Sequence, residues 1–155
     1  MSHILSREAL AETLSTLPGA TVFTNGCFDL MHVGHLRYLQ MARALGDRLV
    51  IGLNSDASVQ RLKGETRPIL PEDERAELLA GLGCVDFVTI FDEPTADPLL
   101  ALLKPQIYAK GGDYTPETLP EAPTVRAYGG EIRIIPFVPG RSTTSLIERI
   151  QALPR

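Results

Sequence analysis

The chain has 155 residues, of which 44% are hydrophobic and 22% charged, as is usual for a single globular domain with a proper core. Its 15 basic and 19 acidic residues give a net charge of −4, which argues against a diffuse positive field that would hold DNA or RNA. No apolar run reaches the roughly 20 residues that span a membrane, and the two cysteines form no CxxC pair, so a cytoplasmic protein without structural zinc or disulfides fits best.

Strands and helices are expected to alternate along the chain. Runs rich in β-branched or aromatic residues predict the strands, and apolar residues at helical spacing predict the helices. In chain order we expect strand 21–24, helix 36–45 with Gly46 as its C-cap, strand 49–53, helix 71–82, strand 85–91, helix 97–104, strand 106–109, strand 131–137 and helix 142–150. The stretch 111–124 is rich in proline, lacks periodicity and is expected to be a loop at the edge of the site.

This alternation predicts one α/β domain over residues 1–155, with a mostly parallel five-stranded sheet flanked by helices. Ligands of such sheets bind at the carboxyl ends of the strands. The residues that directly follow each predicted strand are therefore the first candidates for function.

The segment after the first predicted strand has the outline of a phosphate site. A turn that contains Gly26 precedes a helix, so backbone N–H groups and the helix dipole can both face an anion. His32 and His35 lie three residues apart at the start of that helix, where both can point at one bound group, and Gly34 leaves room for a ligand. Zinc is the alternative, but no cysteine or third ligand lies nearby to support it.

The stretch His32-Val33-Gly34-His35 resembles the HxGH signature of a nucleotidyltransferase superfamily, and the resemblance covers nearly the whole chain. It implies a Rossmann-like domain. Further matching stretches are Thr24-Asn-Gly-Cys-Phe-Asp, Asn54-Ser-Asp56, Arg61-Leu-Lys63-Gly64, Arg67-Pro68, Lys110-Gly-Gly-Asp113-Tyr114 and Ser142-Thr-Thr144. The stretches that begin at Lys110 and Arg61 favour the branch that adenylylates heptose 1-phosphate, which also occurs as one domain of a bifunctional heptose kinase–adenylyltransferase. Glycerol-phosphate cytidylyltransferases are the nearest competitor.

The resemblance implies an in-line attack of a sugar-phosphate oxygen on the α-phosphorus of ATP, with pyrophosphate as the leaving group and Mg²⁺ bound with the ATP. The nucleophile is already ionised, so catalysis should rest on alignment and on neutralising charge rather than on an acid–base pair. The residues with implied catalytic roles are His32, His35 and Lys63. Those implied in nucleotide binding are Asn25, Gly26, Cys27, Phe28, Gly34, Asp113, Ser142, Thr143 and Thr144. Those implied in substrate or phosphate binding are Arg67, Arg75, Lys110, Gly111, Gly112 and Arg141.

Several of these residues have two readings. Asp113 is expected to accept hydrogen bonds from the nucleotide or from sugar hydroxyls, and Ser142 can cap the last helix and bind phosphate at the same time. Arg75 either forms a surface ion pair beside Glu72 and Glu74 or points into the site. Arg141 either reaches phosphate or is solvated. No direct protein ligand is predicted for Mg²⁺.

Two further residues of the first motif have alternative roles. Cys27 as a nucleophile is disfavoured because no covalent step is required. Asp29 is the carboxylate nearest to the HxGH signature, and we favour a role in holding its turn over one in binding the metal.

Three other functions compete with a heptose 1-phosphate adenylyltransferase. The same chemistry serves glycerol 3-phosphate with CTP, or flavin mononucleotide with ATP. A nucleotide-binding regulator without activity belongs to another class, and the intact histidines and Lys63 argue against it. We expect a separate kinase to supply the phosphorylated sugar, and no nucleic acid or membrane partner. The resemblance is compatible with a homodimer, because many members of this superfamily associate.

Overall fold

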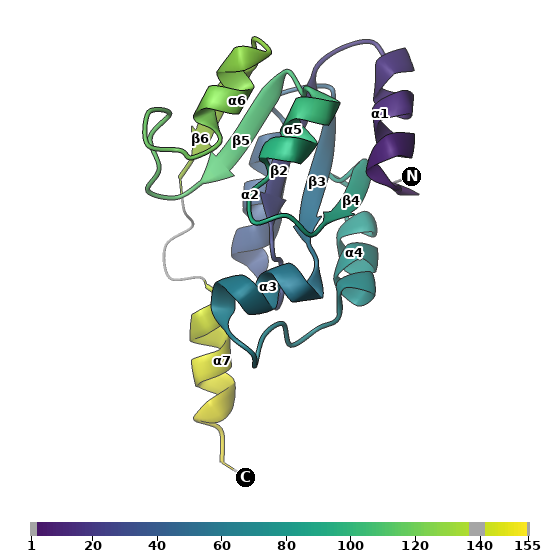
Figure 1. Ribbon diagram of the computed structural model, residues 1–155. Helices are drawn as coiled ribbons and strands as arrows, with labels where there is room; N and C mark the ends of the chain where they lie inside the picture. Colours follow the sequence, from purple (N-terminus) through teal and green to yellow (C-terminus); the bar gives the residue numbers. More distant parts are fainter. Residues whose placement is uncertain (1–2, 137–141, 155) are drawn as a thin grey trace.

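The structure is a computed structural model that describes residues 3–136 and 142–154. Its centre is a six-stranded sheet of order β1-β4-β3-β2-β5-β6 in which every pairing is parallel (Figure 1). The strands are β1 (His3–Ile4), β2 (Thr21–Gly26), β3 (Arg48–Asn54), β4 (Phe87–Phe91), β5 (Ile107–Gly111) and β6 (Glu131–Ile135). The predicted α/β architecture is confirmed, but the predicted five strands are one too few, because β1 has only two residues, both exposed.

Seven helices surround the sheet in the described part of the chain. They are α1 (Arg7–Thr16), α2 (Val33–Arg43), α3 (Asp56–Lys63), α4 (Glu72–Ala80), α5 (Asp97–Leu103), α6 (Ala122–Ala127) and α7 (Thr143–Gln151). Four of them match the predicted helices, although α2 ends with Ala44 as its C-cap rather than Gly46. The others, α1, α3 and α6, add to the prediction, and α6 begins inside the stretch that we expected to be a loop.

Two hydrophobic cores lie on the two faces of the sheet. On one face, α2 and α4 pack Leu39 and Leu79 against the strands. On the other face, α1, α5 and α6 contribute Leu10, Leu99 and Val125. All seven residues of the central strand β3 are buried, as expected for a strand covered by helices on both sides.

Two helices lie beyond the carboxyl edge of the sheet instead of covering a face. In Figure 1, α3 crosses below the strands, and α7 extends away from the rest of the molecule. The last residue of α3 and the first residues of α7 thereby come to the edge at which parallel sheets bind ligands. No helix of the described residues is long and apolar enough to cross a membrane.

Candidate active site

The turn between β2 and α2 has a conformation that buried contacts hold in place. Phe28 has a φ of 45°, in the left-handed region that residues other than glycine rarely adopt, and it is buried. Its ring packs against His35 with centroids 5.5 Å apart. The Asp29 carboxylate accepts hydrogen bonds from the backbone N–H groups of Ile69 and Leu70. This arrangement supports the reading of Asp29 as the residue that holds the turn.

His32 and His35 form a capping box at the start of α2. His32 Nδ1 accepts a hydrogen bond from Gly34 N–H at 3.1 Å, and His35 Nδ1 accepts one from His32 N–H at 3.2 Å. A ring nitrogen that accepts carries no proton, so each neutral ring bears its proton on Nε2. The two rings stack with centroids 4.0 Å apart, and both line the cleft described below. Each imidazole therefore offers an N–H donor and is fixed in orientation by the backbone.

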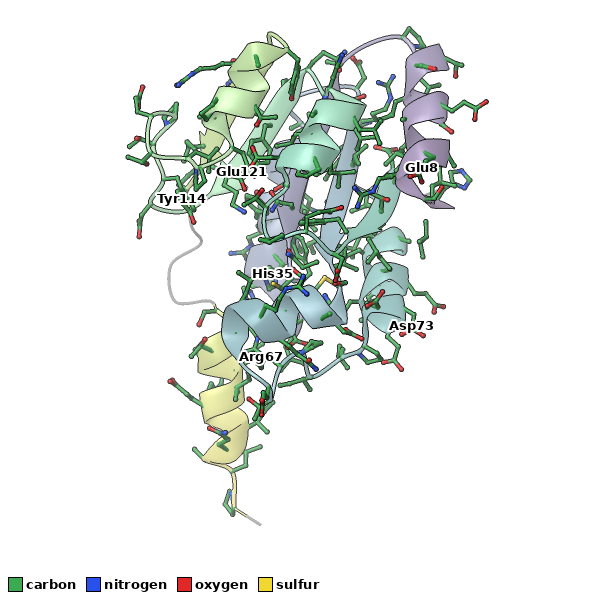
Figure 2. The ribbon with its side chains drawn as sticks, viewed as in Figure 1. Glu8, His35, Arg67, Asp73, Tyr114 and Glu121 are labelled. Carbon is green, nitrogen blue, oxygen red and sulfur yellow. The ribbon has the colours of Figure 1, made fainter. Side chains whose placement is uncertain are left out.

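His35 is held in its neutral form. Burial is the main cause that lowers its pKa from 6.5 to about 4, and the neighbouring His32 and Lys63 contribute to the same shift. In Figure 2, His35 lies at the carboxyl edge of the sheet, close to α3 in this view. At neutral pH this ring acts as a hydrogen-bond donor rather than as a cation.

A cleft of about 370 Å³ opens at this edge and gathers most of the residues that the sequence singled out. Of the residues with predicted roles, those that line it are Asn25, Gly26, Cys27, Phe28, His32, Gly34, His35, Lys63, Lys110, Gly111, Ser142, Thr143 and Thr144. The segments that supply them lie far apart in the sequence and meet where β2, β5, α3 and α7 begin or end. The residues therefore share one site, which is the arrangement that transfer between two phosphates requires.

Arg75 does not belong to this lining, and both predicted readings of it are wrong. Its side chain has no exposed surface. It donates hydrogen bonds to the carbonyl groups of Leu70, Cys27 and Asn54 and pairs with the Asp56 carboxylate at 2.7 Å. Arg75 therefore joins the turn after β2, the end of β3 and the start of α3 from a buried position, because its donors are already used within the protein.

Arg67 has a similar structural role. Its Nε donates to the Asp29 carboxylate at 2.9 Å, and its side chain is largely buried. The Ile69 and Leu70 N–H groups also donate to Asp29, so these contacts hold the segment after α3 against the turn after β2. The predicted contact of Arg67 with phosphate is not supported, because the residue does not line the cleft.

Three more predicted residues lie elsewhere. Asp113 is exposed and does not line the cleft. Gly112 does not line it either; it has a φ of 102° and donates its N–H to Ile135 O at 3.2 Å, so it makes the turn after β5. Arg141 lies outside the described residues.

The cations and the thiol of the cleft differ in their surroundings. Lys63, the last residue of α3, is exposed, whereas Lys110 is partly buried and directs its Nζ at Asn25 O, 3.5 Å away. Burial lowers the pKa of Lys110. Burial raises the pKa of the Cys27 thiol, although Lys63 and other nearby cations oppose this effect. Cys27 is therefore a neutral thiol at pH 7, which agrees with the expectation that it is not a nucleophile.

The start of α7 brings a second set of donors to the cleft. Ser142 caps the helix by accepting from Ser145 N–H at 2.9 Å, and Thr143 Oγ1 donates to Leu30 O at 3.0 Å. Ser142, Thr143 and Thr144 all line the cleft. The positive end of the helix dipole thus faces the same space as the histidines, so the capping and phosphate readings of Ser142 are compatible.

Sequence reasoning missed Tyr38. It lines the cleft, and its hydroxyl lies 2.5 Å from Thr24 Oγ1 and donates to Ala109 O. Burial raises its pKa to about 12. Because Tyr38 follows His35 by three residues on α2, the helical repeat itself could have placed it on the same face.

The described residues include no group of three or more His, Cys, Asp or Glu side chains that could hold a metal ion. Asp29 lines the cleft, but its oxygens already accept from Arg67 and from two loop amides. The Asp29 carboxylate is thus already engaged within the fold.

Comparisons with known proteins identify the family of this chain. A family model described as cytidylyltransferase-like matches residues 23–149. Two proteins named bifunctional protein HldE, from Syntrophotalea carbinolica and Trichlorobacter lovleyi, are 57% and 54% identical over 152 residues, or 96% of this chain. The chain spans 31% of the length of each of these relatives.

A solved structure shows a similar fold. It is described as the lipopolysaccharide core biosynthesis protein from Thermoplasma volcanium GSS1, and it aligns with a TM-score of 0.64 and 29% identity. The alignment covers 78% of this chain and 98% of that one. The predicted resemblance is thus confirmed: the chain belongs to the cytidylyltransferase-like family of nucleotidyltransferases.

Proposed function

We propose that this chain is an adenylyltransferase that transfers AMP from ATP to heptose 1-phosphate and releases pyrophosphate and ADP-heptose. The observation that carries the proposal is the convergence of two fixed imidazole N–H donors, the start of α7 and two lysines on one cleft. That set of groups suits polyphosphate. Similarity to the HldE proteins over 96% of the chain supports the heptose branch that the stretch from Lys110 to Tyr114 indicates.

The proposed reaction is a single in-line displacement. The acceptor phosphate is already ionised and attacks the α-phosphorus directly, so no side chain removes a proton and no bond to the enzyme forms. His32 and His35 donate hydrogen bonds to the α-phosphate that is transferred, where negative charge builds up in the transition state. Because their orientation is fixed before the substrate binds, this stabilisation needs little reorganisation.

The other groups hold the ends of the triphosphate. Lys63 extends from the last turn of α3 toward the cleft and neutralises phosphate charge, and the amides and hydroxyls at the start of α7 bind a second phosphate. Magnesium would be held through the substrate phosphates and water, and it would supply additional charge neutralisation there. Cytoplasmic location and dimerisation stay predictions.

The test is a matrix of substrates. Purified protein with Mg²⁺ is incubated with ATP or CTP and with heptose 1-phosphate or glycerol 3-phosphate, and pyrophosphate release is followed. We expect release only with ATP and heptose 1-phosphate, and a loss of about 10²- to 10³-fold in His35→Ala, which removes one donor to the developing charge. Turnover with CTP and glycerol 3-phosphate would overturn the substrate assignment but keep the site.

A further inference from the structure

A buried carboxylate lies behind the cleft and has no assigned role. Glu121 is only 7% exposed, and it directly precedes α6 between the buried residues Leu119 and Ala122. Its side chain does not cap the helix, and its Oε2 has no hydrogen-bond partner among the described residues. Burying a carboxylate oxygen that accepts no hydrogen bond costs free energy, and a positive charge nearby offsets part of that cost.

The residues that face Glu121 connect it to the cleft. Figure 2 shows Glu121 beside β5, on the side of the sheet that α5 and α6 cover. Tyr108 and Lys110 lie two residues apart on β5 and so share a face of the sheet. The Tyr108 hydroxyl donates to Asn25 Oδ1 at 2.6 Å, and Lys110 Nζ donates to Asn25 O at 3.5 Å. Asn25 and Lys110 both line the cleft, whereas Glu121 does not.

Lys110 and Tyr108 respond differently to burial and to the charge of Glu121. Burial lowers the pKa of Lys110, and the negative charge of Glu121 opposes that effect more strongly than Cys27, the other group that acts on the lysine. Tyr108 stays neutral because burial raises its pKa, and Glu121, Tyr38, Asp97 and Tyr114 raise it further. No ion pair joins Glu121 to Lys110 within the described residues, so Glu121 acts on the lysine through its charge alone.

We propose that Glu121 is a positioning residue for the acceptor side of the cleft, where its buried carboxylate is the counter-charge that keeps the Lys110 ammonium beside Asn25 for the phosphate or hydroxyl groups of the acceptor sugar. This inference rests on the proposed function. It also divides the cleft: the histidines, Lys63 and α7 serve the nucleotide, and the Asn25–Lys110 wall serves the acceptor. Lys110 then recognises the acceptor as an ammonium ion, and the charge of Glu121 offsets the effect of burial, which favours the neutral amine.

The substitution Glu121→Gln tests the inference, with Glu117→Gln as its matched control. Glu117 lies in the same segment, is exposed and loses the same charge. In Glu121→Gln the KM for heptose 1-phosphate should rise about tenfold, which corresponds to the loss of one favourable charge interaction. The value of kcat and the KM for ATP should change less than about twofold. Between pH 7 and 9 the rise in acceptor KM should grow, because an unsupported Lys110 loses its proton sooner.

A second readout needs no substrate. In protein labelled at lysine, the NMR signal of the Lys110 side chain should titrate at lower pH in Glu121→Gln than in the native protein or in Glu117→Gln. An unchanged Lys110 midpoint, or equal losses in kcat and in both KM values, would overturn the inference. An inactive native protein would instead overturn the proposed function, and the Lys110 titration would still decide the role of Glu121.

If Glu121→Gln does not fold, a pair of variants decides the question through stability. Lys110→Met leaves the buried carboxylate without its counter-charge and should lower the melting temperature. Adding Glu121→Gln to Lys110→Met should then restore part of the loss, since the unpaired charge is gone. A further additive loss in the double variant would overturn the inference.

Discussion

His35 Nδ1 accepts a hydrogen bond from the backbone N–H of His32 at 3.2 Å. This contact fixes the tautomer of His35, which the sequence alone does not reveal, because a neutral ring that accepts at Nδ1 carries its proton at Nε2. The capping box that starts α2 is therefore also the device that orients two phosphate donors. Protonation of His35 would break the box, so the same bond links the chemistry of the site to the stability of the fold.

The first prediction concerns pH. The pKa of His35 is lowered from 6.5 to about 4, so the unfolded chain binds a proton at this residue at a higher pH than the folded one does. Its contribution to stability is complete above pH 6.5 and is lost as the pH falls from 6.5 to about 4. Urea unfolding at several pH values should show a shallower loss of stability over this range in His35→Gln. His3→Gln, on the exposed edge strand, is the control, and equal slopes in native protein and His35→Gln would contradict the assignment.

The second prediction concerns Arg75. Replacing it with Met removes the buried cation that joins Cys27, Asn54 and Asp56, and should lower the free energy of unfolding by about 3–5 kcal/mol. Arg37→Met, on the exposed side of α2, changes the same charge and should cost less than about 0.5 kcal/mol. Denaturant unfolding measures both. If Arg75→Met lowers the free energy of unfolding no more than Arg37→Met does, the buried contacts of Arg75 do not stabilise the fold.

The third prediction concerns Cys27. The thiol is neutral and the proposed reaction has no covalent step, so Cys27→Ala should keep kcat within about threefold of the native value. Steady-state kinetics checks this. A loss of two orders of magnitude, or retention of configuration at the α-phosphorus of a chiral ATP analogue, would instead indicate an enzyme-bound intermediate.

The fourth prediction concerns Lys63. Because it lines the cleft from the end of α3, Lys63→Ala should lower kcat/KM for ATP by at least about tenfold while leaving the melting temperature nearly unchanged. Lys104→Ala is the matched control, since Lys104 is also exposed at a helix end but does not line the cleft. If both variants behave alike, Lys63 is a solvated surface residue.

The periodicity of the chain was enough to predict the core of the fold. β3 reads as a continuous apolar run because helices cover both of its faces, and α2 has its apolar residues at regular helical spacing. The edge strand β1 could not be predicted from periodicity, because its two exposed residues form no alternating pattern. The six-residue α6 is likewise too short to form a pattern.

The site was predictable where it is local and not where it depends on distant partners. His32, Gly34 and His35 belong to one turn, so their spacing alone places them together. Arg75 and Arg67 look like surface cations in the sequence. Their burial depends largely on carbonyl and carboxylate groups 19 to 48 residues away, which no local pattern can reveal.

The role of the two imidazole rings as phosphate donors is tested most directly by following them while nucleotide binds. With the protein labelled by ¹⁵N at histidine, long-range ¹H–¹⁵N spectra at pH 7 report the tautomer of His32 and His35 before and after addition of a non-hydrolysable ATP analogue and Mg²⁺. We expect Nε2–H tautomers in both states, with the Nε2–H protons moved downfield as they bond to phosphate. Protonated rings in the free protein, or Nε2–H signals that do not respond to the nucleotide, would contradict this role.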